Sequence, residues 1–349
     1  MSNRRTAVVL FNLGGPDKPA AVRPFLFNLF SDPAIITLPN PWRWLVAQLV
    51  SRRRAPVAQE IYQKMGGSSP ILPNTEAQAD ALIQELGDLG QVRSFICMRY
   101  WEPMTADVVR AVKEYGADEI ILLPLYPQFS TTTTASSYKL WQEEAARQGL
   151  TTQTKLICCY PTEPGFIQAL VHGTATGLAE AKRLAPSAEP LVVFSAHGLP
   201  KKIVDAGDPY VAQVKAGVTA VAEALALPAV QWVTAFQSRV GPLEWVGPAT
   251  EDVIRDAAEA KRAIVVVPVA FVSEHSETLV ELDIEYRELA EHHQAAAYVR
   301  VPTVSADGDF ILGLAGLVRT AIGKDEKIQA GVGRAFCGDG SRCLCRTMS

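Results

Sequence analysis

Seven short apolar runs, separated by segments with helical periodicity, constrain this chain more than any other feature. The runs cover residues 7–12, 92–99, 119–124, 154–159, 190–195, 231–236 and 263–269. Amphipathic segments such as residues 74–86, 106–115 and 165–184 lie between them. Strands buried in a parallel sheet form continuous apolar runs, and strands that alternate with helices build such sheets. The sequence therefore predicts an α/β fold with doubly wound parallel sheets.

The two halves of the chain repeat three segments in the same order. VVLFNLGGP (8–16) resembles LVVFSAHGLP (191–200), MRYWEP (98–103) resembles QSRVGP (237–242), and ILLPLYPQFS (121–130) resembles VVVPVAFVSE (265–274). Ligands of open α/β sheets bind outside the carboxyl ends of the strands. We therefore expect two doubly wound, Rossmann-like domains that face a central cleft, although helix–strand periodicity alone also produces echoes of this kind.

The two expected domains differ in the segments that they carry, and a tail follows them. Residues 1–150 should form the N-terminal half with an inserted lip at about 25–73, residues 151–325 the C-terminal half with an acidic helix, and residues 326–349 a cysteine-rich tail. The lip is rich in aromatic and aliphatic residues, and Arg52, Arg53 and Arg54 follow it. An apolar patch beside a basic run suits a large flat ligand with carboxylates, and it also suits a membrane surface. Ordinary core with solvated arginines is the alternative.

An acidic segment directly follows the apolar run at 263–267. It contains Glu274, His275, Glu277, Glu281 and Glu285. We expect a helix with Ser273 as its N-cap, on which the glutamates form one stripe because residues three and four apart share a face. Like charges at that spacing repel, whereas imidazole and carboxylate groups suit divalent first-row metals. The segment predicts a cation route, and a solvated helix face is the alternative.

A histidine at the end of another apolar run supports a site. His197 and Gly198 follow the run at 191–194. His197 should lie at the carboxyl end of a strand, where it could converge with the acidic segment. The hydroxyl-rich loop at 126–137 offers donors for a phosphate or carboxylate, or simply helix caps. A loop histidine without a ligand is the alternative for His197.

Composition excludes several classes of protein. The chain has 349 residues, 48% apolar content and a net charge of −4. It lacks the basic surface expected of a nucleic-acid-binding protein, and no apolar run approaches the ~20 residues of a membrane span. The N-terminus reads as a first strand and not as a signal peptide. We expect a cytoplasmic protein whose cysteines form no structural disulfides.

Nine segments together resemble one enzyme family. They are FNLGGP (11–16), RRRAP (52–56), MGGSSPI (65–71), MRYWEP (98–103), LYPQFSTTTTASS (125–137), FSAHGLP (194–200), GDPY (207–210), QSRVGPLEWVGP (237–248) and FVSEHSETLVELDIEY (271–286). In this order they resemble ferrochelatase, which inserts ferrous iron into a porphyrin at the end of haem synthesis. The resemblance extends to about residue 320.

The resemblance implies the residues of the site. It implies His197, Glu277 and His275 as the catalytic group, and His197, Glu277 and Glu281 as the residues that handle Fe²⁺. It also implies porphyrin contacts by Arg53, Arg54, Ser69, Arg99, Tyr100 and Tyr126. A neutral imidazole can accept a pyrrole proton near pH 7, and carboxylates can hold Fe²⁺ loosely. Which group takes protons and which binds iron stays open.

The C-terminal tail carries three cysteines, Cys337, Cys343 and Cys345. Some ferrochelatases hold a [2Fe–2S] cluster on three C-terminal cysteines and one internal cysteine, and this tail resembles theirs. Its C-x5-C-x-C spacing differs from the animal pattern, and Thr131 stands where the animal internal ligand would be. The resemblance implies Cys158, or alternatively Cys159, as the fourth ligand. Zinc binding by the tail and simple packing of the internal cysteines are the alternatives.

Several alternatives remain open at the level of sequence. Coproporphyrin could replace protoporphyrin IX as the substrate, or the chain could be a non-catalytic porphyrin or haem carrier. A cobalt or nickel chelatase for an earlier tetrapyrrole is a further alternative. A dinucleotide oxidoreductase is disfavoured because no G-x-G-x-x-G motif occurs. A homodimer, and peripheral contact of the lip with the cytoplasmic face of a membrane, are compatible with the sequence.

Overall fold

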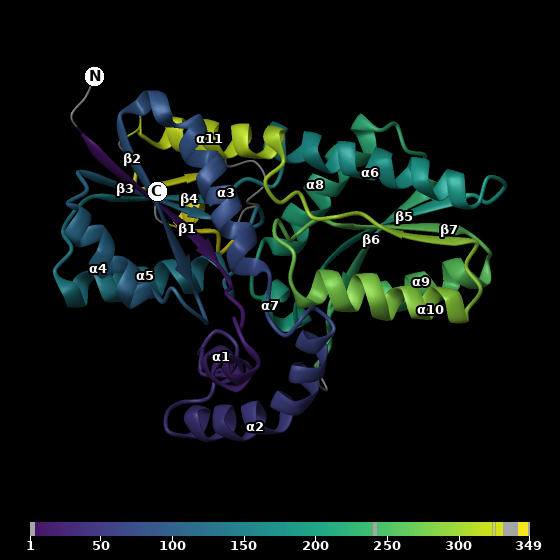
Figure 1. Cartoon of the computed structure of the whole chain (residues 1–349), viewed down its shortest axis with the longest axis horizontal. Helices are drawn as coiled ribbons and strands as arrows, with labels where there is room; N and C mark the ends of the chain where they lie inside the picture. Colours follow the sequence, from purple (N-terminus) through teal and green to yellow (C-terminus); the bar gives the residue numbers. More distant parts are fainter. Residues whose placement is uncertain (1–3, 240–242, 323, 325, 331–340, 348–349) are drawn as a thin grey trace. The chain divides into compact units, whose positions relative to one another are not determined.

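The structure is a computed structural model that describes all residues except 1–3, 240–242, 323, 325, 331–340 and 348–349 (Figure 1). The chain divides into two compact units. The first comprises Met1–Cys159, Leu314–Gly331 and Met348–Ser349, and the second comprises Tyr160–Gly313 and Val332–Thr347. The sequence suggested a boundary near residue 150, whereas the first unit continues through the next strand because that strand pairs within its sheet.

The first unit contains a five-stranded parallel sheet in the order β2-β1-β3-β4-β9. Its strands are β1 (Arg5–Asn12), β2 (Gln91–Met98), β3 (Glu119–Pro124), β4 (Thr154–Cys159) and β9 (Ile328–Ala330). Every residue of β3 is buried, as the apolar run predicted. The register aligns Asn12 with Met98 and Phe11 with Pro124, so the loops after β1, β2 and β3 leave the sheet at one edge.

Helices of the first unit flank this sheet and extend beyond it. They are η1 (Pro19–Ala21), α1 (Val22–Phe30), α2 (Trp42–Gln63), α3 (Ile71–Glu85), η2 (Gly87–Leu89), α4 (Thr105–Tyr115) and α5 (Thr134–Gln148), and α11 (Gly308–Ile322) enters from the second unit. Helices α1 and α2 lie side by side beyond the end of β1 (Figure 1). Phe25 on α1 and Tyr62 on α2 share a buried cluster with Tyr100, which fixes this pair to the loop after β2.

The second unit contains a four-stranded parallel sheet in the order β6-β5-β7-β8. Its strands are β5 (Pro190–His197), β6 (Trp232–Gln237), β7 (Ala263–Pro268) and β8 (Ala297–Arg300). Its helices are α6 (Pro164–Leu184), α7 (Lys201–Asp205), α8 (Tyr210–Ala224), η3 (Ala229–Gln231), α9 (Thr250–Glu259), the π-helix η4 (Glu277–Glu285), α10 (Tyr286–His292) and α12 (Leu344–Thr347).

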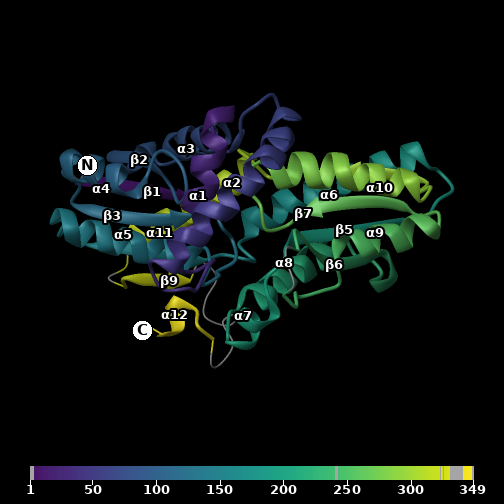
Figure 2. The same ribbon diagram turned by 90° about the horizontal axis from the view of Figure 1, so that it is seen from below.

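Helices cover both faces of the second sheet, with α6 and α8 on one side and α9 and α10 on the other (Figures 1 and 2). On the α9 and α10 face, Ile254 and Tyr286 pack against Val193 and Val266 of the strands. On the opposite face α6 approaches the sheet closely at Gly177, where an added Cβ would lie 2.7 Å from a Val301 methyl group. The predicted α/β fold with parallel sheets is confirmed.

The expected helix in the acidic segment is wrong in its start and in its type. Ser273 is not its N-cap, because the helix begins at Glu277 and Ser276 precedes it. Residues Glu277–Glu285 form a π-helix, in which hydrogen bonds run from i to i+5. Glu274 and His275 therefore lie before the helix, and Glu285 is exposed. The single α-helical stripe of glutamates does not form.

Candidate functional site

The second unit places His197 at the carboxyl end of its sheet. His197 is the last residue of β5 and pairs with Gln237 of β6. Its Nδ1 lies 2.6 Å from the carbonyl oxygen of Gly198. A carbonyl only accepts hydrogen bonds, so Nδ1 carries the proton and Nε2 of the neutral ring keeps its lone pair. An added Cβ on Gly198 would lie 2.9 Å from the Gln237 carbonyl oxygen, so glycine permits this close turn.

The Glu277 carboxylate lies between two imidazoles. The Nε2 atom of His197 is 3.8 Å from one carboxylate oxygen, and Nε2 of His275 is 3.8 Å from the other. The Phe271 ring contacts both imidazoles, with centroid distances of 6.5 Å to His197 and 4.4 Å to His275. Because 3.8 Å exceeds a direct hydrogen bond, the three polar groups face one another without being joined. The structure thus brings together the three residues predicted as catalytic.

Two atoms of this cluster are buried without a hydrogen-bond partner in the described part of the chain. They are Nδ1 of His275 and one carboxylate oxygen, Oε2, of Glu277. Most buried polar atoms in folded proteins are paired, so such an atom calls for a functional explanation. The cluster presents unused imidazole and carboxylate positions, which are suitable for a metal ion or a proton.

Two glutamates one turn apart have opposite pKa shifts. Burial acts to raise the pKa of Glu277, but the charges of His197 and His275 outweigh it and hold this pKa well below its usual range. Burial, together with the neighbouring Glu277 charge, raises the pKa of Glu281. A pair whose environments separate their pKa values can hold one group ionised and the other protonated. Glu277 is therefore the carboxylate that stays ionised.

Glu281 is held by several hydrogen-bond donors. It accepts from the backbone N–H of Ser238 at 2.9 Å, from the Tyr286 hydroxyl at 2.9 Å and from the Gln237 amide at 3.3 Å, and the Ser238 hydroxyl donates as well. Ser238 has φ of 60°, a left-handed conformation that is uncommon outside glycine. The carboxylate thus fastens the π-helix to the end of β6. No local sequence pattern indicated this role of Glu281.

Glu274 has a structural partner. It accepts hydrogen bonds from Arg300 Nη1 at 2.5 Å and from the Thr303 backbone N–H at 3.0 Å. The Arg300 side chain is 9% exposed and that of Glu274 15%, so the ion pair is largely buried. Arg300 also reaches Asp283 on the π-helix at 3.2 Å. This pair fixes the segment directly before His275.

The first unit places Arg99 and Tyr100 directly after β2. Arg99 Nη2 donates to Asp32 Oδ2 at 2.6 Å, and the Tyr100 hydroxyl donates to the same oxygen at 2.7 Å. Tyr100 is buried, and burial raises its pKa well above the usual range. Tyr126 follows β3 and is partly buried, and burial raises its pKa too. Asp32 is a polar centre that the sequence analysis did not identify.

The remaining predicted porphyrin contacts have different surroundings in the first unit. Arg53 and Arg54 are exposed on α2, and neither makes an ion pair with another described residue. Ser69 is buried, and its hydroxyl accepts from the Ile71 backbone N–H at 3.4 Å. An added Cβ on Gly15 would lie 2.5 Å from the Ser69 hydroxyl oxygen, so glycine is needed for this close approach.

Comparison with known proteins decides the family. A family model described as Ferrochelatase matches residues 5–322. The chain belongs to the ferrochelatase family. A ferrochelatase of Caulobacter vibrioides (strain NA1000 / CB15N) is 49% identical over 347 residues, which cover 98% of each chain. A ferrochelatase of Pelagibacter ubique (strain HTCC1062) is 47% identical over 317 residues, which cover 90% of each chain.

Solved structures support the same fold. The structure of SirB from Bacillus subtilis with Fe³⁺ has a TM-score of 0.52 and 14% sequence identity, and the match covers 93% of this chain and 99% of SirB. At this identity the likeness shows the fold alone. The predicted family and the predicted enzyme class, a metal chelatase, are confirmed by the family match and the two relatives.

The cysteines in the described part of this ferrochelatase-family chain are buried and form no disulfide with one another. Cys158 and Cys159 end β4 in the first unit, and Cys343 and Cys345 lie in the second, where their sulfur atoms are 3.2 Å apart. Each of these four side chains offers a thiol with the chemistry to bind a metal ion. Cys337 lies outside the described residues. Cys343 in the tail is fully buried.

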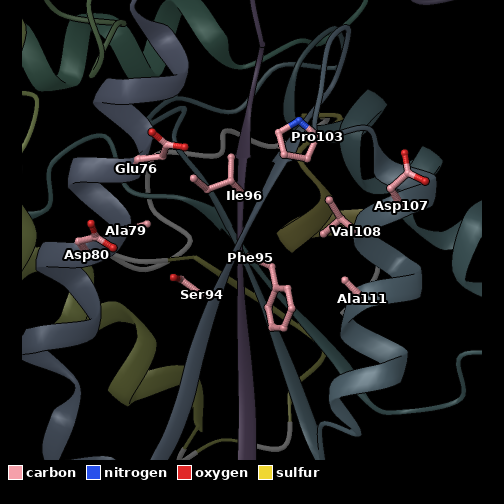
Figure 3. Close-up of a pocket in the computed structure, with 10 residues that line it drawn as sticks. All are labelled: Glu76, Ala79, Asp80, Ser94, Phe95, Ile96, Pro103, Asp107, Val108 and Ala111. Atoms are coloured by element: carbon pink, nitrogen blue, oxygen red, sulfur yellow. The ribbon is translucent and has the colours of Figure 1, made fainter.

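The first unit also has an open hollow that contains none of the predicted site residues. It lies beside β2 between α3 and α4, and its volume is about 610 Å³ (Figure 3). Phe95 and Val108 supply apolar lining, and the carboxylates of Glu76, Asp80 and Asp107 surround it. The residues predicted to carry out iron insertion therefore lie outside this hollow.

Proposed function

We propose that this protein inserts Fe²⁺ into protoporphyrin IX and produces protohaem and two protons. The observation that carries the proposal is the cluster of His197, Glu277 and His275, in which the imidazole Nε2 of His197 lies 3.8 Å from a carboxylate oxygen of Glu277. The reaction requires two pyrrole protons to leave and a hydrated Fe²⁺ to lose water. An imidazole lone pair and a carboxylate provide a proton acceptor and a loose iron ligand.

The roles within the cluster follow from what each group already binds. His197 and Glu277 are proposed as the pair that meets Fe²⁺ and the pyrrole protons, and His275 supports Glu277 from its other side. Glu281 is proposed as a further group for iron. Because its oxygens already accept several hydrogen bonds, it would have to exchange them for the metal. Glu281 is accordingly placed after Glu277 in the iron path.

The first unit is proposed to hold the porphyrin. Arg53 and Arg54 are exposed cations that suit the propionates, and Ser69 offers a hydroxyl. Arg99 and Tyr126 are proposed as contacts of the ring. Tyr100 is proposed to contribute to the same surface, although its hydroxyl is engaged by Asp32.

An anaerobic spectroscopic assay tests this function. Purified protein is mixed with Fe²⁺ and either protoporphyrin IX or coproporphyrin, and the visible spectrum is followed. We expect the free-porphyrin bands of protoporphyrin IX to disappear as haem bands rise. Turnover with coproporphyrin alone would move the assignment to that substrate, and porphyrin binding without insertion would indicate a carrier. Co²⁺ or Ni²⁺ turnover without Fe²⁺ turnover would indicate a different chelatase.

We further propose that Cys158, Cys337, Cys343 and Cys345 bind a [2Fe–2S] cluster, with Cys159 as the alternative to Cys158. Thiolates are the ordinary ligands of such clusters, and the four described thiols are buried and not in disulfides. When bound, the cluster would supply a redox-active cross-link among these thiols. The close approach of the Cys343 and Cys345 sulfur atoms supports the fit of this donor set.

Metal analysis tests the cluster. Anaerobically purified protein should contain about two iron and two sulfide per chain and absorb visible light, as the [2Fe–2S] composition requires. Cys343→Ser should lose both, whereas Cys97→Ser should keep them, because Cys97 is buried next to Thr105 and outside the proposed set. Colourless protein with bound zinc would contradict the proposal. Loss in only one of Cys158→Ser and Cys159→Ser would identify the internal ligand.

The lip is proposed to contact a membrane surface at the cytoplasmic face. Trp42, Trp44 and Leu49 are 63%, 50% and 51% exposed on α2, and Arg52 to Arg54 follow on the same helix. Exposed tryptophans beside cations are typical of peripheral binding to anionic lipids. No described helix is long and apolar enough to cross a membrane.

Vesicle sedimentation tests this contact. The wild-type protein should bind anionic vesicles more strongly than neutral ones, and Trp42→Ser with Trp44→Ser should remove most of the binding. Val230→Ser is the control, because Val230 is 77% exposed in the second unit and outside the lip. Equal binding by wild type and the double variant would contradict the proposal. Size-exclusion chromatography would test the homodimer with which the sequence is compatible.

A further inference from the structure

Asp32 is a buried acid at the base of the lip. It lies two residues after the end of α1, and only 4% of the residue is exposed. Its Oδ2 accepts hydrogen bonds from Arg99 Nη2 at 2.6 Å, from the Tyr100 hydroxyl at 2.7 Å and from the Ser136 hydroxyl at 2.7 Å. Its Oδ1 accepts from the backbone N–H of Ala34 at 2.8 Å. One carboxylate therefore joins the lip, the loop after β2 and helix α5.

The partners of Asp32 are themselves fixed to the sheet. The backbone N–H groups of Arg99 and Tyr100 donate to the carbonyls of Asn12 and Leu13, at 2.9 and 3.0 Å. The Arg99 Nε also donates to the Ser136 hydroxyl at 3.0 Å. The Arg99 backbone is therefore held by the end of β1, and its guanidinium is oriented by Asp32 and Ser136.

The guanidinium retains unused donors. Arg99 has five N–H groups, and its hydrogen bonds to the described residues Ser136 and Asp32 use two of them, one on Nε and one on Nη2. The side chain is 15% exposed, so part of the charged group reaches the surface of the unit. The guanidinium also lies 4.9 Å from the centre of the Tyr100 ring, which restricts its rotation further. Asp32 thus determines where the remaining N–H groups of Arg99 point.

Asp32 also fixes the first turn of the lip. Its backbone carbonyl accepts from Ile35 and Ile36 at 3.0 and 2.9 Å, and its Oδ1 caps Ala34. Exposed apolar side chains follow at once, since Ile35 is 40% exposed and Leu38 is 43% exposed. Asp32 therefore holds in place both the Arg99 guanidinium and the turn that leads to Ile35 and Leu38.

We propose that Asp32 is a positioning residue for porphyrin binding. It holds the Arg99 guanidinium in the orientation that contacts the porphyrin and fixes the apolar base of the lip beside it, and it does not itself contact the substrate. This inference rests on the proposed function, in which Arg99 contacts the porphyrin. Removing the negative charge would leave three donors directed at a neutral group, so Arg99 would turn away.

Asp32→Asn is the first test, because it keeps the size of the side chain and removes the charge. We expect the porphyrin dissociation constant and KM to rise about tenfold, which corresponds to the loss of about one charge-assisted hydrogen bond. The kcat at saturating porphyrin should change less than about threefold, since the His197 cluster is intact. A purely structural role would instead reduce the fraction of active protein and leave KM unchanged. Asp17→Asn is the control, because Asp17 is an exposed acid that accepts from Trp101 Nε1 in the same unit.

A double-mutant cycle tests whether Asp32 acts through Arg99. If it does, Asp32→Asn combined with Arg99→Leu should bind porphyrin no more than about twofold weaker than Arg99→Leu alone. The proposal would be overturned if the two substitutions weakened porphyrin binding independently, so that their fold-changes multiply in the double variant. An unchanged porphyrin affinity of Asp32→Asn would overturn it as well. If wild type neither binds porphyrin nor inserts Fe²⁺, the proposed function fails, and the role of Asp32 in it fails with it. Normal turnover by Asp32→Asn beside an active wild type would reject the role of Asp32 alone.

A second variant keeps the test informative if Asp32→Asn does not fold. Ser136→Ala retains the Asp32 charge and removes one hydroxyl that contacts both Asp32 and Arg99. We expect KM for porphyrin to rise about threefold, because one neutral hydrogen bond is lost. An unchanged KM in a folded Ser136→Ala protein would overturn the proposal.

Discussion

The polar groups around Asp32 in the first unit and those around Glu277 in the second differ in their hydrogen bonding. In the first unit the Asp32 carboxylate is fully engaged, and its partners donate at 2.6 to 2.8 Å. In the second unit His197 and His275 stand 3.8 Å from the Glu277 carboxylate, and buried atoms of the cluster have no hydrogen-bond partner among the described residues. We call the fully hydrogen-bonded network of Asp32, Arg99, Tyr100 and Ser136 the closed set. We call the cluster of His197, Glu277 and His275 the open set.

This difference separates binding from chemistry. A fully hydrogen-bonded buried network is rigid and can hold a binding surface in one geometry. Groups that are close but not joined keep the capacity to take up a proton or a metal ion during a reaction. We infer that the first unit is preorganised to position the porphyrin, whereas the second provides the reactive groups.

His197→Ala should have the largest effect on iron insertion. If it did not, the contrast between a binding unit and a reactive unit would be wrong. Removal of the imidazole should lower kcat for iron insertion by about 10³-fold, within the range that general base catalysis contributes. Porphyrin affinity should change little, because the proposed porphyrin contacts lie in the first unit. Stopped-flow absorbance and porphyrin fluorescence measure the two quantities. His172→Ala is the control, since His172 is exposed on α6. A near-normal kcat in His197→Ala would show that His197 takes no part in the mechanism.

Glu277→Gln should have the next largest effect. The amide keeps the shape but cannot hold Fe²⁺ as a carboxylate does, so kcat should fall by about 10²-fold at limiting Fe²⁺. Part of this loss should be recovered at high Fe²⁺ if the carboxylate delivers the metal. Initial rates across a range of Fe²⁺ measure this. Glu291→Gln, an exposed change on α10, is the control, and a loss that is independent of Fe²⁺ would assign Glu277 to protons.

The sequence predicted the open set better than the closed one. His197 could be placed because an apolar run identifies a buried strand and the residue after it lies at the edge of the sheet. Asp32 could not be placed, because the three donors to its Oδ2 atom are 67, 68 and 104 residues away and no local pattern connects them. Periodicity reports burial along one element, whereas a hydrogen-bonded network depends on how distant elements meet.

The same limit explains the errors in the acidic segment and the sheets. The π-helix at Glu277–Glu285 accompanies the contacts of Glu281 with Ser238 and Tyr286, which a pattern of charges does not reveal. Strands β8 and β9 were missed because they have four and three residues, too few for a clear period. All seven predicted strands are present, with ends that shift by one or two residues.

Arg300→Leu should affect stability more than catalysis. Arg300 supports the open set by pairing with Glu274 directly before His275, and its removal leaves a largely buried carboxylate without its cation. We expect the free energy of unfolding to fall by about 3 kcal/mol, at the lower end for a broken buried pair. Urea unfolding measures it. Arg255→Leu should cost under about 1 kcal/mol, because its pair with Asp252 is exposed, and equal losses would show that the Arg300 pair contributes little.

The pH dependence of stability should distinguish Glu277 from Glu281, and we expect these effects to be the smallest. The pKa of Glu277 is lowered in the folded protein, so its ionised form stabilises the fold above the unfolded value of about 4.3, and this contribution disappears as the pH falls towards the folded pKa. The pKa of Glu281 is raised, so its contribution is present below about pH 4.3 and is lost as the pH rises through the folded pKa. Relative to Glu277→Gln, wild type should lose stability as the pH falls below about 4.3; relative to Glu281→Gln, it should lose stability as the pH rises. Urea unfolding of the three proteins between pH 3 and 8 measures both differences, and parallel curves would mean that the two carboxylates do not differ in the way their surroundings indicate.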